Sequence, residues 1–308
     1  LGGVFGGAVP ATPLGRYAAQ FGGMAVGDVD GDGDLDVVFT HNQGPAYFLR
    51  NTGGGVLVDD STFFDSDLSS VENFWSATMA DFNEDGRLDL HIAVDEPSKK
   101  DLHYLQQPDG SFVNSAVASG ISAGGNDMGV AVGDIDNDGD FDFYSTNIAR
   151  QVLYVNDGTG VFADEAVQRG VAYSDVGGFA CTAWGTVLAD FDNDCDQDLA
   201  FVASGDQGAV FENDGTGHFA GVSSGCGVVT YGSALAQFDY DRDGDLDLLL
   251  TRSDGKAVLY ANASPAAEGN HWLAVKLHGR ESNTDGIGAR VYVTSDDLTQ
   301  VQQMLASG

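Results

Sequence analysis

The feature that most constrains this chain is an acidic nine-residue loop that occurs five times at nearly regular spacing. The first copy reads DVDGDGDLD, and all five keep aspartate at positions one, five and nine. Their starts are separated by 53, 53, 56 and 49 residues. A period in this range indicates a repeat architecture in which each unit is one supersecondary structure. The copies span residues 28–36, 81–89, 134–142, 190–198 and 239–247.

Each unit predicts four short strands, which we name A to D in chain order. A small or apolar run precedes the acidic loop, and a strand-like run such as LDVVFT follows it. A third run leads into a glycine-rich turn, and Asn-Asp-Gly or Pro-Asp-Gly between such runs is a hairpin signal. Convincing helical periodicity is absent. Four strands per unit, repeated radially, predict an all-β fold, a β-propeller whose acidic loops join strands A and B.

The ends of the chain predict how the ring closes. Residues 3–9 resemble the D strand of a unit, whereas the last acidic unit lacks a D strand. We therefore expect the N-terminal strand to complete the last blade, which removes free sheet edges. The repeats give five blades, and six or seven if the C-terminal segment adds strands. The predicted domains are a propeller over 1–265 and a separate segment over 266–308.

The acidic loops have the composition of calcium sites. Alternate side chains converge on one point, and carboxylate and carbonyl oxygens suit Ca²⁺, which takes about 6–8 oxygen ligands. An EF-hand is excluded because its twelfth residue should be Glu. We expect the seventh residue to donate its backbone carbonyl, which leaves the aspartates there as surplus outward charge. The predicted ligands are Asp28, Asp30, Asp32, Asp34 and Asp36; Asp81, Asn83, Asp85, Arg87 and Asp89; Asp134, Asp136, Asp138, Asp140 and Asp142; Asp190, Asp192, Asp194, Asp196 and Asp198; and Asp239, Asp241, Asp243, Asp245 and Asp247.

The five loops are not equivalent, although five acidic runs in register argue against merely solvated turns. The second loop carries Asn83 and Arg87 where others carry aspartate. In the fourth loop Cys195 replaces the turn glycine, which costs strain if its φ is positive. We expect about five Ca²⁺ ions, with weaker binding at the second and fourth loops.

Composition limits the classes of partner. The chain has 13 Lys and Arg against 47 Asp and Glu, a net charge of −34. Nucleic acid and anionic membranes would repel such a surface. No apolar run approaches the length of a membrane span, so direct membrane insertion is not expected. Of the three cysteines, Cys181 and Cys226 are predicted to pair and Cys195 to stay free.

The repeat resembles a known group. The combination of GDVDGDGDLDVVFT with the later NDGTGVF is similar to the FG-GAP/VCBS repeat of integrin-α-type β-propellers. The run from Asn270 to Val293 resembles the start of the ASPIC/UnbV domain of cartilage acidic protein-like proteins. The resemblance implies an extracellular, cell-surface or periplasmic propeller, stabilised by Ca²⁺ and acting in adhesion or recognition.

A partner is expected on the face opposite the calcium loops. In a propeller the A–B and C–D connections share one face, and the B–C and D–A connections share the other. The second face should carry basic residues, namely Arg16, Lys99, Lys100, Arg150, Arg169, Arg252 and Lys256. Trp75 and Trp184 enter strand A near this face. They could form a stacking platform for a sugar, although packing between blades is the favoured interpretation.

No catalytic motif stands out. The six histidines form no His-Glu-x-x-His pair, and no Gly-x-Ser-x-Gly elbow is present. Ca²⁺ explains the paired carboxylates more simply than hydrolase chemistry does. The sequence therefore predicts a non-catalytic calcium-binding propeller for adhesion or protein–protein interaction, and the alternative is a lectin that binds through the opposite face.

Overall fold

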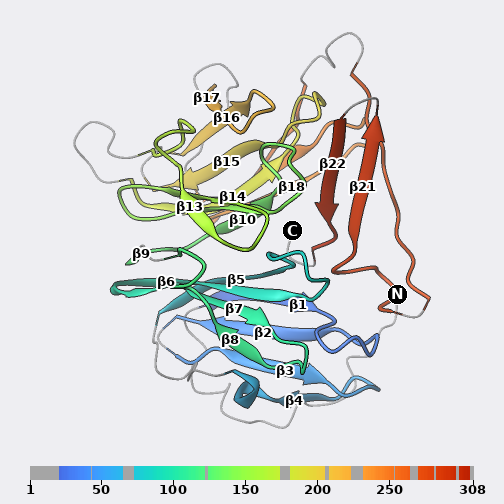
Figure 1. Ribbon diagram of the computed structural model, residues 1–308. Coiled ribbons are helices and arrows are strands. Elements are labelled where there is room, and N and C mark those ends of the chain that lie inside the picture. Colours follow the sequence, from blue (N-terminus) through green and yellow to red (C-terminus); the bar gives the residue numbers. More distant parts are fainter. Residues whose placement is uncertain are drawn as a thin grey trace.

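The protein is an all-β propeller of five blades, as the repeats predict (Figure 1). The computed structural model describes residues 21–42, 44–64, 73–121, 124–173, 181–204, 208–222, 232–252, 254–263, 270–280, 282–295 and 298–305. Four blades have four antiparallel strands in chain order, and the fifth has three among the described residues. The inner strands of the first four blades run across the picture one above another (Figure 1).

The first two blades occupy the N-terminal half of the ring. Blade 1 comprises β1 (Phe21–Gly27), β2 (Asp36–His41), β3 (Tyr47–Asn51) and β4 (Leu57–Asp59), followed by a short 3-10 helix, η2 (Ser61–Phe63). Blade 2 comprises β5 (Phe74–Ala80), β6 (Asp89–Lys100), β7 (Leu102–Gln106) and β8 (Phe112–Asn114), and β9 (Gly124–Asn126) pairs with the far end of β6.

The remaining blades follow the same order. Blade 3 comprises β10 (Val130–Gly133), β11 (Asp142–Ser145), β12 (Val152–Asn156) and β13 (Phe162–Asp164). Blade 4 comprises β14 (Ala183–Ala189), β15 (Asp198–Ala203), β16 (Ala209–Asn213) and β17 (Phe219–Gly221). Blade 5 comprises β18 (Ala234–Phe238), β19 (Asp247–Thr251) and β20 (Ala257–Tyr260). The N-terminal strand that should complete blade 5 lies outside the described residues.

Each acidic loop joins the first two strands of its blade, as predicted. The last residue of every loop begins the second strand, for example Asp36 in β2 and Asp142 in β11. Because neighbouring side chains of a strand point to opposite faces, each blade packs apolar side chains on both sides. The core therefore lies in layers between successive blades. Aromatic rings fill these layers, such as Phe82, Phe143 and Phe162 between blades 2 and 3.

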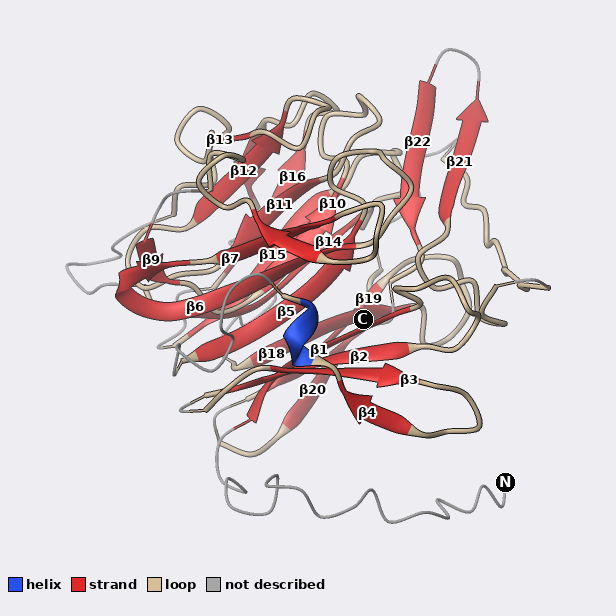
Figure 2. Cartoon of the chain, turned by 60° about the horizontal axis from the view of Figure 1, so that its bottom comes forward, coloured by secondary structure: helices blue, strands red, loops and turns tan. Residues whose placement is uncertain are grey.

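The C-terminal segment folds over the acidic-loop end of the propeller. It ends in a hairpin of β21 (Arg290–Ser295) and β22 (Leu298–Gln303), which stands at this end of the ring (Figures 1 and 2). Val301 of β22 is buried in the same cluster as Phe82 and Phe141. These contacts attach the segment to the propeller. The sequence resemblance to the ASPIC/UnbV domain stays a prediction.

No helix in the described part of the chain is long and apolar enough to cross a membrane.

Candidate metal centres and the adjoining recess

The ninth aspartate of each loop organises the loop backbone. In the first loop, Asp36 Oδ2 accepts the Val29 N–H at 3.0 Å and Oδ1 accepts the Asn51 N–H at 2.8 Å. The same pair of bonds recurs at Asp89, Asp142, Asp198 and Asp247. All five carboxylates are buried. Each ninth aspartate therefore ties its loop to the end of the third strand.

The first and fifth aspartates shape the turn. Asp28 Oδ2 accepts the Gly33 N–H at 3.0 Å, and the first aspartate of every other loop accepts the equivalent N–H. Asp32 Oδ1 accepts the Asp34 N–H at 2.8 Å, and this bond also recurs in all five loops. With the backbone held in this way, the remaining carboxylate oxygens converge on one point.

Four of the loops bring three carboxylates together. In each group one oxygen from every residue lies within 4.8 Å of the others. Such a set of hard oxygen ligands fits Ca²⁺ in the number and type of atoms. Carboxylates so close repel one another, and a divalent cation removes that repulsion. The groups are Asp28, Asp30 and Asp32; Asp134, Asp136 and Asp142; Asp190, Asp192 and Asp194; and Asp239, Asp241 and Asp247.

Burial makes the carboxylates of the ninth aspartates costly to ionise without a cation. Desolvation raises the pKa of Asp89 and Asp198 to about 7, and that of Asp36 to about 6. For Asp142 desolvation raises the pKa well above its ordinary value. Burial also differs between loops: Asp134, Asp140 and Asp142 of the third loop are buried, whereas Asp241 and Asp243 of the fifth are exposed.

At the second loop, arginine side chains supply the positive charge. The guanidinium of Arg290, from β21, donates from Nη1 to Glu84 Oε1 at 2.8 Å and from Nη2 to the Asp81 carbonyl. Its Nε lies 3.8 Å from Asp81 Oδ2, and its charge lowers the pKa of Asp81 against the larger raising effect of burial. Arg87 pairs with Asp85 in the same loop. Two arginines thus compensate charge in the loop predicted to bind Ca²⁺ weakly.

The prediction of surplus charge at the seventh position is wrong for three aspartates. Asp140 is buried rather than outward-facing. Asp196 Oδ1 accepts Asn137 Nδ2 at 2.8 Å, and Asp245 Oδ1 accepts Asn193 Nδ2 at 2.7 Å. Both donors belong to the loop of the preceding blade. The Asp196 and Asp245 side chains therefore connect neighbouring loops, a contact between distant residues that the pattern of one loop does not reveal.

Backbone strain in the loops is confirmed at Cys195, whose φ is 81°. The turn glycines of the other loops have φ between 84° and 102°. The fourth residue of every loop is a second left-handed position, which the sequence did not predict; these residues are Gly31, Glu84, Asn137, Asn193 and Arg242. Only the glycine and asparagines there are residue types that favour this conformation, so they were the available signal.

A second missed feature is an amide at the end of each third strand. Asn156 Nδ2 donates to the Phe82 carbonyl at 2.9 Å, in the acidic loop of the preceding blade. Gln106, Asn213 and Asn262 make the equivalent bond to Val29, Ile135 and Phe191. The recurring Asn or Gln in LQQ, VND, END and ANA was the available signal. These hydrogen bonds connect blades 2 to 5 to the acidic loop of the preceding blade.

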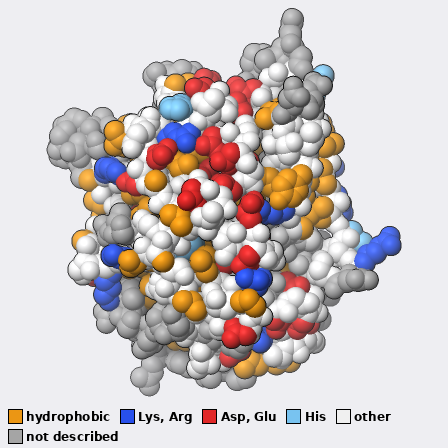
Figure 3. Space-filling view, in the orientation of Figure 1, with side chains coloured by type: hydrophobic (Ala, Val, Ile, Leu, Met, Phe, Trp, Pro, Cys, Tyr) orange, Lys and Arg blue, Asp and Glu red, His pale blue; other side chains and the backbone are white. Residues whose placement is uncertain are grey.

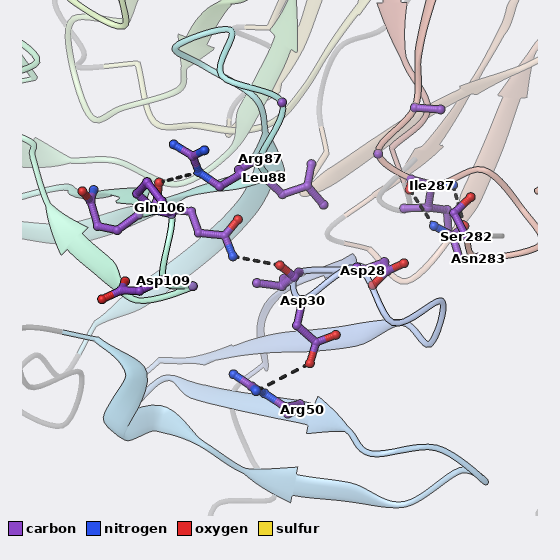
Figure 4. Close-up of a pocket in the computed structure, with 18 of the residues that line it drawn as sticks. Asp28, Asp30, Arg50, Arg87, Leu88, Gln106, Asp109, Ser282, Asn283 and Ile287 are labelled. Atoms are coloured by element: carbon purple, nitrogen blue, oxygen red, sulfur yellow. Dashed lines mark hydrogen bonds and ion pairs between the residues drawn. The ribbon is translucent and has the colours of Figure 1, made fainter.

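A recess of about 600 Å³ lies between the first two acidic loops, beside the C-terminal segment. Figure 4 shows Asp28 and Asp30 on one side, Arg87, Leu88 and Gln106 on another, and Ile287 with Asn283 on the third. Arg50 pairs with Asp30 at 3.5 Å and with Asp60 at 3.1 Å. The recess mixes charged, amide and apolar walls, which suits recognition of a polar ligand.

On the opposite face the structure brings the two predicted tryptophans together. The Trp75 and Trp184 rings meet edge to face with centroids 5.3 Å apart. Trp75 Nε1 donates to Asp95 Oδ2 at 2.8 Å, and Trp184 Nε1 donates to Ser204 Oγ at 3.0 Å. Both side chains are half-buried. Because they come from blades 2 and 4, the pair joins two non-adjacent blades, which agrees with the favoured packing role.

One basic residue does not lie where the sequence placed it. Arg169 was expected on the face opposite the loops, but its Nη2 lies 3.0 Å from Asp136 of the third acidic loop. The D strand β13 has only three residues, so the chain after it turns back along the loop. Arg16 and Cys226 lie outside the described residues, and the Cys181–Cys226 pair stays a prediction.

Comparison with known proteins agrees with this geometry. A model of the FG-GAP-like repeat matches residues 28–92, 81–145 and 190–250, together more than half of the chain. The protein belongs to this family. No curated protein sequence matches the chain.

Solved structures with a similar fold are distant. An Agrocybe aegerita lectin that recognises non-reducing terminal N-acetylglucosamine is 18% identical with a TM-score of 0.41, over 80% of this chain and 67% of the lectin. The V. cholerae biofilm matrix protein Bap1 is 14% identical with a TM-score of 0.42, over 78% of this chain and 36% of Bap1. Likeness at this level says nothing about a shared ligand.

Proposed function

We propose that the protein is a non-catalytic, calcium-stabilised recognition module that acts in adhesion or protein interaction outside the cytoplasm. The observation that carries this proposal is the set of four carboxylate triads, each built into the hairpin of its blade. When bound, Ca²⁺ supplies the charge compensation that these clustered carboxylates need. Extracellular Ca²⁺ modules work at about 10⁻⁴–10⁻³ M, which suits an extracellular, cell-surface or periplasmic location.

The chemistry of the loops supports a structural rather than a catalytic role. The ninth aspartates spend both oxygens on backbone N–H groups, and the first aspartates hold the turn. Acidic side chains gather in groups on the surface with basic ones beside them (Figure 3). Carboxylates committed to backbone amides and cations are poor candidates for general acid or base.

The proposed partner site is the face opposite the acidic loops. There β6 runs on for 12 residues and its far end pairs with β9 (Figure 1). Lys99 and Lys100 end this extension. A strand pair that ends in basic residues suits an acidic protein segment or an acidic glycan as its ligand.

Calorimetry after chelation tests the calcium role. We expect Ca²⁺ to bind with measurable heat, to raise the melting temperature and to saturate near four ions per chain. Mg²⁺ at the same concentration is the control ion, because it demands a tighter octahedral shell. If Ca²⁺ gave neither heat nor a higher melting temperature, the proposal would fail.

A glycan ligand on the opposite face is the second candidate, because Trp75 and Trp184 are only partly buried and leave aromatic surface on that face. A glycan array tests it with Trp184→Ala, and Trp272→Ala is the matched control because Trp272 lies beside Gly244 of the fifth acidic loop. Glycan binding lost in the first variant alone supports the lectin. Binding by neither the wild type nor the control contradicts it.

A further inference from the structure

The second acidic loop differs from the four loops that form carboxylate triads. Each triad includes the third residue of its loop, which is Asp30, Asp136, Asp192 or Asp241. The second loop has Asn83 at this position and so offers a neutral amide oxygen in place of a carboxylate. All residues of this loop are described, and they form no triad. The second loop therefore has one carboxylate fewer to share with a cation.

Buried oxygens without a hydrogen bond mark where a cation is needed. Asp28 Oδ1, Asp136 Oδ1 and Asp192 Oδ1 each belong to a triad, are buried and accept no hydrogen bond. An ionised oxygen in this state is costly unless a cation binds it. These three oxygens lie in the first, third and fourth loops. Within residues 81–89, all of them described, no carboxylate oxygen is buried without a partner.

The three aspartates of the second loop already have donors for both carboxylate oxygens. Asp81 accepts the N–H groups of Asp85 and Gly86, each at 3.0 Å. Asp85 accepts the Arg87 N–H at 3.0 Å and also pairs with the Arg87 guanidinium. Asp89 accepts two backbone N–H groups, as the ninth aspartate of every loop does. These carboxylates therefore have their partners without a metal ion.

Arg290 adds a second positive charge to this loop from outside the repeat. Besides its bonds to Glu84 and to the Asp81 carbonyl, its Nε lies 3.8 Å from Asp81 Oδ2. The Arg290 side chain is only 12% exposed, and the Asp81 side chain is 9% exposed. A divalent cation bound to Asp81 and Asp85 would lie beside the guanidinium groups of both Arg87 and Arg290, which would repel it.

The C-terminal segment makes further contacts with the same loop. Gln303 Oε1, at the end of β22, accepts the Asp81 N–H at 3.2 Å. Gly288 packs closely on Leu88, because a Cβ added at Gly288 would lie 3.3 Å from Leu88 Cδ1. Arg290 and Gln303 are paired residues of the β21–β22 hairpin. Both strands of the hairpin are thus attached to the second loop.

We propose that the second acidic loop binds no Ca²⁺ and is instead the docking site of the C-terminal segment, with the Arg290 guanidinium as its cation. This inference rests on the proposed calcium role of the other loops. It divides the acidic loops into two kinds. Four take their cation from solution, and one takes it from a side chain of the same molecule. Docking of the hairpin on this loop therefore does not require calcium.

Calcium titration of two matched variants tests the proposal. Asp85→Asn and Asp32→Asn make the same change at the fifth position of the second and the first loop. In both variants the asparagine oxygen can still accept the N–H that the aspartate accepts. We expect Asp85→Asn to bind as many ions as the wild type, and Asp32→Asn to lose one ion or to weaken one site by about 10-fold or more. An equal loss in both variants overturns the proposal.

A gain of one ion tests the role of the arginines. The triple variant Asn83→Asp, Arg87→Asp, Arg290→Gln supplies the missing aspartates and removes both guanidinium groups. We expect it to bind one more Ca²⁺ ion than the wild type. A cooperative melting transition shows that it folds. A folded triple variant that gains no ion would contradict the assignment of Arg87 and Arg290 as the cations of this loop.

Hydrogen exchange with and without a chelator tests the docking. Removal of Ca²⁺ should speed exchange in the four loops that carry triads and leave residues 81–89 and β21 unchanged. In Arg290→Gln, β21 should exchange fast under both conditions. If the chelator speeds exchange in wild-type β21 as much as in the triad loops, docking depends on calcium and the proposal fails.

The stoichiometry of the wild type separates this proposal from the proposed function. Binding of four ions agrees with both. Binding of five ions would overturn the docking proposal and support the calcium role, whereas the absence of any bound ion would overturn both.

Discussion

At the scale of single residues, the acidic loops combine metal ligands with left-handed backbone. Cys195 has φ of 81° at the position that is glycine in the other four loops. A side chain in this conformation costs about 1–2 kcal/mol, offset by the greater freedom of an unfolded glycine. Folding of the fourth loop is therefore less favourable than folding of a loop with glycine at this position.

Replacing Cys195 by glycine should stabilise the protein. We expect Cys195→Gly to raise the free energy of unfolding by about 1 kcal/mol, measured by urea denaturation in saturating Ca²⁺. The reciprocal change, Gly139→Ala in the third loop, should lower it by a similar amount. An added Cβ at Gly139 meets no atom within 4 Å, so its cost is backbone strain alone. Equal stability of Cys195→Gly and the wild type would contradict this account.

The burial of His103 should make the stability of the fold depend on pH. It is fully buried among Phe82, Phe143 and Phe162, and desolvation lowers its pKa to about 3 from the ordinary 6.5. Below pH 6.5 the unfolded chain binds a proton that the folded chain refuses until about pH 3, so stability falls as the pH falls through that window.

The variant His103→Phe removes this proton linkage. Relative to the wild type we expect it to gain about 2 kcal/mol between pH 8 and pH 5, measured by denaturation in saturating Ca²⁺. Phe48 occupies the equivalent position of blade 1, which indicates that the fold accepts the ring. A difference between the two proteins that does not change with pH would refute the linkage.

At the scale of elements, the sequence predicts what is local and repeated. The five acidic loops, their flanking strands and the glycine-rich turns all follow from spacing within one unit. The inter-blade amides were missed because Asn156 and its acceptor Phe82 lie 74 residues apart. Arg290 was missed for the same reason: it reaches Glu84 across 206 residues and belongs to no repeat. Contacts of this kind depend on how blades stack, which periodicity does not encode.

Arg290 should hold the C-terminal hairpin on the propeller. Its side chain is mostly buried against the second acidic loop and lies over the Phe141 ring at 4.5 Å. We expect Arg290→Gln to lower the free energy of unfolding by about 1–3 kcal/mol because it leaves Asp81 and Glu84 without their cation. Hydrogen exchange should become faster in β21 and β22. Arg280→Gln is the control, since Arg280 is exposed, and exchange that changes equally in both variants would contradict the role of Arg290.

At the scale of the whole molecule, calcium and pH should act together. Burial raises the pKa of Asp134 and Asp194, which belong to two of the triads, to about 6, so without a cation the folded loops hold protons that the unfolded chain releases. The calcium-free protein therefore loses stability from these groups as the pH rises from about 4 to 7. Ca²⁺ binds the ionised carboxylates, and its stabilising effect should grow over the same window.

Melting curves with Ca²⁺ and with chelator check this coupling. We expect the melting-temperature gain from Ca²⁺ to be clearly larger at pH 7.5 than at pH 5. The wild type at constant ionic strength with Mg²⁺ provides the control for general screening. A calcium effect that is the same at both pH values would show that the carboxylates do not titrate with binding.

The unequal burial of the loops has a kinetic consequence. Ions held by the exposed Asp241 and Asp243 of the fifth loop have a short path to solvent, whereas Asp134, Asp140 and Asp142 of the third loop are enclosed. When the surrounding calcium falls, we expect the sites to empty in sequence, the exposed first and fifth loops early and the third loop late. Blades 1 and 5 would then lose rigidity before blade 3 does.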